Sequence, residues 1–161
     1  MKFEINEKVI HYREGLSIIV GTTTMNNRKY YLVKAVHAKD ETIYVPFETA
    51  EQMVRAIMSI DESNKVIEYM RTVKPEFISN TKQRRDIYKK RLGSGNVYDL
   101  AYLACQLFLF KYLNEHGTVV KLGPTDIEML EYARNVLFDE FSLSFGKPLE
   151  IIKSLVESRM L

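Results

Sequence analysis

The sequence of 161 residues contains no tryptophan and only one cysteine, Cys105. A single cysteine cannot form a disulfide within the chain, which favours a reducing, cytoplasmic compartment. No apolar run reaches the roughly 18 residues needed to span a bilayer, and residues 1–9 do not have the layout of a secretory signal. With 46% hydrophobic and 27% charged residues, the composition predicts a globular protein of one ordinary domain or two small ones.

The chain also lacks the residue constellations of an enzyme. Its three histidines, His11, His37 and His116, are scattered and do not have the spacing of a zinc site. Cys105 lies in the most apolar segment, where we expect a core thiol rather than a nucleophile. Residues 93–95 lack the strand and the Gly/Lys spacing of a nucleotide-binding loop. We therefore expect no enzyme activity, cofactor or metal; a site assembled from dispersed polar residues stays open, and would require a deep pocket.

Charge is present but unevenly distributed. The formal net charge is only +2, yet residues 82–91 (KQRRDIYKKR) carry six basic residues and one acidic residue. Residues 92–161 carry nine acidic and six basic residues. Clustered cations favour phosphate binding through the release of counterions. The basic segment is therefore a candidate phosphate-binding surface, and the alternative is an ordinary solvated helix face.

The first part of the chain has the pattern of strands. β-branched and aromatic residues dominate four segments: residues 8–12, 16–24, 28–36 and 41–46. Asn26-Asn27 predicts a hairpin turn, and Lys39-Asp40 a second turn. Four short strands suit a small antiparallel β barrel, with three tyrosines divided between its core and its outer face: Tyr30, Tyr31 and Tyr44.

After Pro46 the apolar pattern changes to the period of a helix. The expected helices are residues 50–58 after Thr49, 62–73 after Asp61, a basic helix ending near Leu92, a buried central helix at 97–114 after Asn96, one after Thr125, and a final one after Pro148. The sequence thus predicts an α+β protein in which a β domain at residues 1–48 precedes a helical bundle at residues 49–161.

In this order and spacing, the segments resemble the CarD/CdnL family of bacterial transcription regulators. The resemblance extends over nearly the whole chain. It is carried by Phe3, Ile5, Lys8-Val9-Ile10, Gly15, residues 31–33, residues 45–51, residues 92–96, and residues 129–143. It implies that the β domain is a Tudor/SH3-like barrel and that the protein binds RNA polymerase.

The resemblance also implies where the two partners bind. The β domain would dock on the β subunit of RNA polymerase through its sheet, using Thr22, Thr24, Met25, Thr42 and Tyr44. The helical domain would contact promoter DNA without sequence specificity and stabilise the melted state. The phosphate contacts would come from Arg84, Arg85, Lys89, Lys90 and Arg91. Neither a membrane nor a cofactor is implied, and a monomer is the simplest oligomeric state.

Spacing on a helix limits which of these cations act together. Arg85 and Lys89 are four residues apart and share one face, whereas Arg84 and Arg91 are seven apart and share another. Thr81 stands where the family usually has a tryptophan that wedges against the minor groove, and threonine is too small for that role. The alternative is therefore a protein-interaction module that binds polymerase or another protein but has lost its DNA activity.

Overall fold

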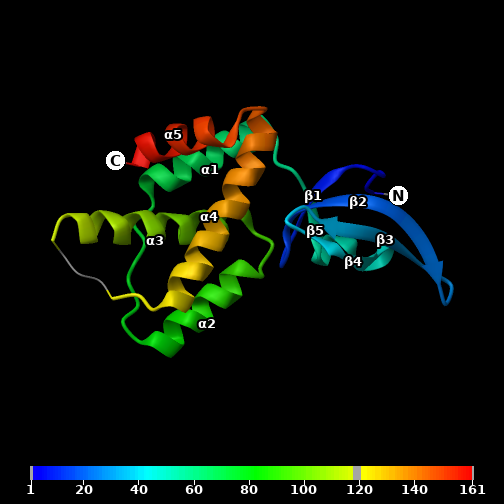
Figure 1. The fold of residues 1–161 in the computed structure, drawn as a ribbon, viewed down its shortest axis with the longest axis horizontal. Helices are drawn as coiled ribbons and strands as arrows, with labels where there is room; N and C mark the ends of the chain where they lie inside the picture. Colours follow the sequence, from blue (N-terminus) through cyan, green and yellow to red (C-terminus); the bar gives the residue numbers. More distant parts are fainter. Residues whose placement is uncertain (1, 118–120, 161) are drawn as a thin grey trace. The chain divides into compact units, whose positions relative to one another are not determined.

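The computed structural model describes residues 2–117 and 121–160, which form two compact units, Met1–Ile57 and Met58–Leu161. The first unit is an antiparallel β sheet and the second is a set of helices (Figure 1). The predicted α+β class is confirmed. The boundary between the units lies between Ile57 and Met58 in the chain, rather than between residues 48 and 49 as predicted, because a short fifth strand belongs to the sheet of the first unit.

The sheet has five antiparallel strands in the order β4-β3-β2-β1-β5. The strands are β1 Lys8–His11, β2 Gly15–Met25, β3 Arg28–Ala35, β4 Ala38–Pro46 and β5 Val54–Ala56. Among the described residues, β4 and β5 are the two edges and do not pair with each other. The sheet is therefore open, and the prediction of a closed barrel is wrong in this respect.

The two predicted hairpin turns differ in how clearly the sequence marks them. Asn26 and Asn27 have φ values of 50° and 62°, the left-handed conformation that asparagine tolerates, so the predicted turn is confirmed. The second turn is at Val36 and His37, because Ala35 pairs with Ala38. The prediction of a turn at 39 and 40 is wrong. Neither residue of the actual turn has a positive φ, so the turn requires no glycine or asparagine.

Tyr31 organises the core of the β unit. Its side chain is 1% exposed, its ring stacks on Phe47 at 4.1 Å between centroids, and its hydroxyl accepts hydrogen bonds from the Lys2 and Phe3 N–H groups at 2.8 and 3.2 Å. Tyr44, in contrast, is 49% exposed. The predicted division of the tyrosines is confirmed.

The segment after β4 differs from the prediction. A helix was expected at 50–58, but Phe47–Gln52 forms a short 3₁₀ helix and β5 follows it. β5 pairs with β1, with Val54 opposite His11, and the side chains of Ala50 and Val54 are buried in the β core. Pairing with the free edge of β1 gives hydrogen-bond partners to backbone N–H and C=O groups. This stabilises a strand here although the spacing of the apolar residues is that of a helix.

The second unit contains five helices among its described residues: α1 Ile60–Thr72, α2 Thr81–Leu92, α3 Val97–Glu115, α4 Pro124–Phe145 and α5 Leu149–Met160. α3 is packed by α1, α2 and α4, and Cys105 in this helix is buried. Burial raises the pKa of the Cys105 thiol to about 12. The predictions of a central buried helix and of a core thiol are confirmed. No helix among residues 2–117 and 121–160 is long and apolar enough to cross a membrane.

The N-cap residues of three helices can be compared with those predicted from the sequence. Asn96 caps α3 as predicted, accepting the Tyr98 N–H at 2.9 Å. α1 is capped by Ser59 rather than by residue 61, because Ser59 and Glu62 accept each other's backbone N–H, a capping box. α4 begins after Gly123 rather than after residue 125.

One buried group in the β unit makes its stability sensitive to pH. His11 is 6% exposed, and its Nδ1 accepts the backbone N–H groups of Arg13 and Glu14, both at 3.1 Å. Burial lowers the pKa of His11; the Glu14 carboxylate opposes this effect and the Arg13 charge adds to it. The folded state therefore favours the neutral imidazole, because protonation would remove the Nδ1 acceptor.

We expect the free energy of unfolding to fall as the pH drops below about 6.5, where the histidine of the unfolded chain becomes protonated. The loss should not exceed about 1.4 kcal/mol per pH unit. Urea unfolding at several pH values measures it. His11→Asn, whose Oδ1 can replace Nδ1 as an acceptor, should flatten the profile. Identical profiles for the wild type and His11→Asn would contradict this assignment.

Candidate nucleic-acid interface on helix α2

Helix α2 carries the basic segment, and its ends are well defined. Asn80 caps it by accepting the Gln83 N–H at 2.9 Å, and Gly93 ends it by donating its N–H to the Lys89 carbonyl at 3.2 Å. Three cations in the last turn interact favourably with the negative end of the helix dipole. The predicted basic helix is thus confirmed, with Thr81 as its first residue.

α2 has two fully buried side chains, Arg84 and Tyr88, of which the tyrosine contacts α3. The Tyr88 hydroxyl donates to the Gln106 side-chain oxygen, and the Gln106 amide donates to the Glu76 carbonyl. Burial raises the pKa of Tyr88 to about 12. The hydroxyl therefore keeps its proton at neutral pH and donates it to α3. Through Gln106 it also links α2 to the backbone of the segment that precedes α2.

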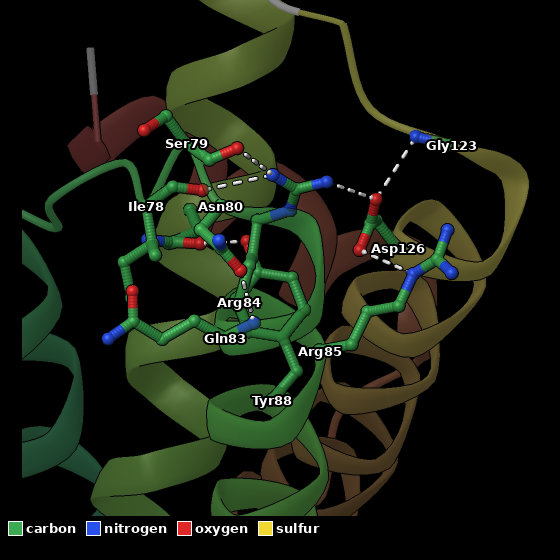
Figure 2. Close-up of polar contacts among 10 residues, drawn as sticks. Ile78, Ser79, Asn80, Gln83, Arg84, Arg85, Tyr88, Gly123 and Asp126 are labelled. Carbon is green, nitrogen blue, oxygen red and sulfur yellow. Dashed lines mark hydrogen bonds and ion pairs between the residues drawn. The ribbon is translucent and has the colours of Figure 1, made fainter.

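The second anchor is an ion pair between α2 and the first turn of α4 (Figure 2). Arg84 donates one terminal N–H group to the Ile78 carbonyl at 2.9 Å and another to Asp126 Oδ2 at 2.8 Å. The same oxygen accepts the Gly123 N–H at 3.1 Å, and Arg85 Nε lies 3.6 Å from the other carboxylate oxygen. One carboxylate thus interacts with two consecutive arginines and with the start of α4.

Asp126 is completely buried, with an exposed fraction of 0%. Burial acts against its charged form, but the hydrogen bonds from Arg84 and Gly123 and the charges of both arginines outweigh burial and hold its pKa below the ordinary value. The carboxylate therefore remains ionised at neutral pH. It compensates the charge of Arg84, whose exposed fraction is 3%.

Arg91 is also held against the protein. Its terminal nitrogen lies 2.7 Å from Asp99 Oδ1, and its side chain is 32% exposed. Its guanidinium stacks 3.9 Å above the centre of the Tyr102 ring, a cation–π arrangement. Arg84 and Arg91 are thus both engaged in internal ion pairs. Arg84 is not available to a phosphate, contrary to its predicted role, because the helix turns its side chain into the interior.

The remaining cations of α2 point outward. Lys82, Lys89 and Lys90 are exposed, and the Arg85 side chain is 38% exposed. At about 100° per residue, Lys82, Arg85 and Lys89 fall within roughly 60° of one another around the helix. In the part of the chain that the structure describes, none of the three lysines is paired with a carboxylate. We call Lys82, Arg85, Lys89 and Lys90 the outer cations of α2.

One outer cation was not among the five predicted phosphate contacts. Lys82 is exposed like Lys89 and Lys90, and its place within the basic run was the available signal. Thr81, in the first turn of the same helix, is exposed. Asp126 and Gly123 were not predicted, because they are distant in sequence and become relevant only when α4 packs against α2.

The residues predicted to bind polymerase divide between the two faces of the sheet. Thr22 pairs with the buried Tyr31, and Tyr44 pairs with Leu32. Because paired residues share a face and successive residues alternate, Thr22 and Thr24 lie on the face opposite Tyr44. All five predicted residues are exposed: Thr22, Thr24, Met25, Thr42 and Tyr44. Met25 pairs with Arg28, which shares the face of Leu32. The five residues therefore form two groups, Thr22 and Thr24 on one face and Met25, Thr42 and Tyr44 on the other.

The other buried carboxylate of the helical unit also has a structural partner. Glu140 is 0% exposed and accepts the Met58 N–H at 2.9 Å. Among the described residues, no three His, Cys, Asp or Glu side chains gather in a way that could hold a metal ion.

The Arg84–Asp126 pair should dominate the stability of the α2–α4 contact. Asp126→Ala leaves a buried arginine without its counter-charge, and we expect a loss of about 3–5 kcal/mol in the free energy of unfolding. Replacing both partners by apolar residues, Arg84→Met with Asp126→Leu, should recover most of it. Asp86→Ala, an exposed aspartate on the same helix, is the control and should change stability by no more than about 0.5 kcal/mol. Urea unfolding measures all three; a neutral Asp126→Ala would refute the role of the pair.

Comparison with known families agrees with the division of the chain into two units. A family model described as the CarD-like/TRCF RID domain matches residues 3–58. A second model, described as the CarD C-terminal domain, matches residues 65–157. The first match covers the β unit and ends at its boundary, and the second covers all or most of the five helices. The chain therefore belongs to the CarD-like family of transcription-associated proteins.

Proposed function

We propose that this protein is a non-enzymatic transcription regulator of the cytoplasm that binds the β subunit of RNA polymerase through its β unit. In this proposal the outer cations of α2 contact promoter DNA and change the stability of the open complex. The observation that carries the proposal is the presence of both CarD-like domains, in order, over nearly the whole chain. The protein acts by binding alone, without a cofactor, as a monomer.

The physical logic is that of a two-site binder. A protein that holds polymerase with one surface presents its other surface to nearby DNA at a high effective concentration. Weak contacts with phosphates are then sufficient, and no sequence reading is required. The near-neutral net charge of +2 is compatible with this role, because the relevant cations are gathered on the exposed side of one helix.

The polymerase surface would be the exposed part of the sheet. Met25 and Tyr44 are large apolar side chains with 41% and 49% exposure, and exposed threonines lie beside them on β2 and β4. Amphipathic aromatic residues are common anchors of protein interfaces. Because Met25, Thr42 and Tyr44 share one face and Thr22 and Thr24 lie on the other, a partner that uses the two large apolar side chains would contact the face of Tyr44.

The second candidate is a protein-interaction module without DNA activity. It is favoured by Thr81, whose short side chain cannot be inserted between bases as a wedge. Phe77, 42% exposed, precedes α2 but packs its ring edge-on against Phe110 at 5.4 Å. The dependence of binding on salt separates the two candidates, because only phosphate contacts release counterions.

Purified RNA polymerase should be retained by the immobilised protein. Met25→Asp and Tyr44→Asp, made separately, each replace one of the two large exposed apolar side chains of the polymerase surface with a charge. We expect at least one of them to weaken binding about tenfold or more, as for an interface anchor. Ile151→Asp, an equally exposed apolar residue on α5, is the matched control and should bind as the wild type does. Failure of the wild-type protein to retain polymerase would overturn the central proposal.

Duplex DNA should bind with a strong dependence on salt. The logarithm of the binding constant is plotted against the logarithm of the salt concentration between about 50 and 200 mM. The slope should become less steep by nearly 3 when Lys82, Lys89 and Lys90 are all changed to alanine, since each phosphate contact contributes about 0.9. The control changes three exposed lysines on other helices, Lys65, Lys111 and Lys153, and should keep the wild-type slope. A slope near zero for the wild type, with polymerase still bound, would favour the interaction module. Lifetimes of open promoter complexes then report the effect on transcription.

A further inference from the structure

Arg84 and Arg85 are adjacent in sequence but have opposite environments. The terminal nitrogens of Arg84 are occupied by Asp126 and by the carbonyls of Ile78 and Ser79, and its side chain is 4% exposed. The Arg85 side chain is 38% exposed, although its Nε is fully buried. The two terminal nitrogens of Arg85, unlike Nε, are not among the buried unpaired atoms and therefore reach solvent.

The carboxylate of Asp126 orients this guanidinium. Arg85 Nε lies 3.6 Å from Asp126 Oδ1, and Figure 2 shows the two terminal nitrogens directed away from the carboxylate. Among the described residues, no hydrogen bond or ion pair involves these two nitrogens. Because Arg84 compensates the carboxylate at 2.8 Å, Arg85 keeps its positive charge for a group outside the protein.

Gly123 limits the position of the same group from the other side. A Cβ atom added at this glycine would lie 3.1 Å from a terminal nitrogen of Arg85 and 3.6 Å from Asp126 Oδ2. The backbone φ of Gly123 is −73°, a value that any residue adopts, so its backbone conformation does not require glycine. What the glycine provides is space for the Arg85 guanidinium.

We propose that Arg85 is the bidentate phosphate contact of α2, and that Asp126 and Gly123 are positioning residues that hold its guanidinium outward. This inference rests on the proposed function, and adds that α2 binds DNA through one oriented arginine rather than through a diffuse basic surface. A planar guanidinium with both terminal nitrogens free matches two phosphate oxygens at once, which a lysine cannot do. Lys82, Lys89 and Lys90 then act as point charges around one oriented contact.

The first test separates geometry from charge. Arg85→Lys keeps the charge but loses the paired donors, so we expect duplex DNA to bind about tenfold more weakly with an unchanged salt slope. Arg85→Ala should weaken binding at least as much and lower the slope by about 0.9. Arg159→Lys on α5, an exposed arginine, is the matched control and should bind as the wild type does. Wild-type affinity for Arg85→Lys would overturn the proposal.

The second test examines the positioning residues. Gly123→Ala adds one methyl group beside the Arg85 guanidinium without changing any charge. We expect weaker DNA binding from Gly123→Ala in the wild type and no further effect in the Arg85→Ala background. An equal loss in both backgrounds would contradict the positioning role. Thermal unfolding of each variant excludes a general loss of structure, and Asp126→Glu, which retains the carboxylate, should bind more tightly than Asp126→Asn.

The two proposals fail in different ways. If wild-type protein shows no salt-dependent binding to the duplex, the DNA part of the proposed function fails. If the wild type binds and the alanine substitutions of Lys82, Lys89 and Lys90 weaken binding, but Arg85→Ala does not, the proposed function stands and the role of Arg85 is refuted.

Discussion

The buried carboxylate of Asp126 determines what α2 can present to a partner. α2 has few apolar side chains, and its two fully buried residues, Arg84 and Tyr88, are both held by polar partners. Its orientation therefore depends on hydrogen bonds of defined direction rather than on apolar packing, which has no direction. These bonds hold α2 with Arg84 and Tyr88 inward and the three lysines of the basic segment outward.

The same anchoring redistributes the charge that the sequence displays. The segment KQRRDIYKKR contains six cations, but Arg84 and Arg91 are paired with carboxylates of α4 and α3. Four outer cations remain beside the exposed Asp86. Internal pairing thus leaves four of the six cations on the exposed side of the helix, where a phosphate backbone can contact them.

The elements that were predictable are those whose signals are local. The buried α3, the Asn26-Asn27 turn and the Asn96 cap depend on neighbouring residues, and their structure agrees with the sequence pattern. β5 and the open sheet were missed because β5 exists only through pairing with β1 across a large sequence separation. The same distinction applies to the candidate site. The basic helix was predictable from local signals, whereas the inward direction of the Arg84 side chain depends on Asp126, some forty positions later.

The absence of tryptophan constrains how such a surface could influence promoter opening. A wedge residue interacts with separated base pairs and therefore favours the melted state directly. Phosphate contacts exist in both duplex and melted DNA, and a ligand that binds two states equally does not shift their equilibrium. With Thr81 at the start of α2, an effect on the open complex therefore requires that polymerase bring the DNA backbone closer to the outer cations in the open state than in the closed one. The path of the DNA on polymerase would then determine the selectivity. An oriented contact such as Arg85 would depend on that path more strongly than a lysine, because a guanidinium fork accepts only a narrow range of phosphate positions.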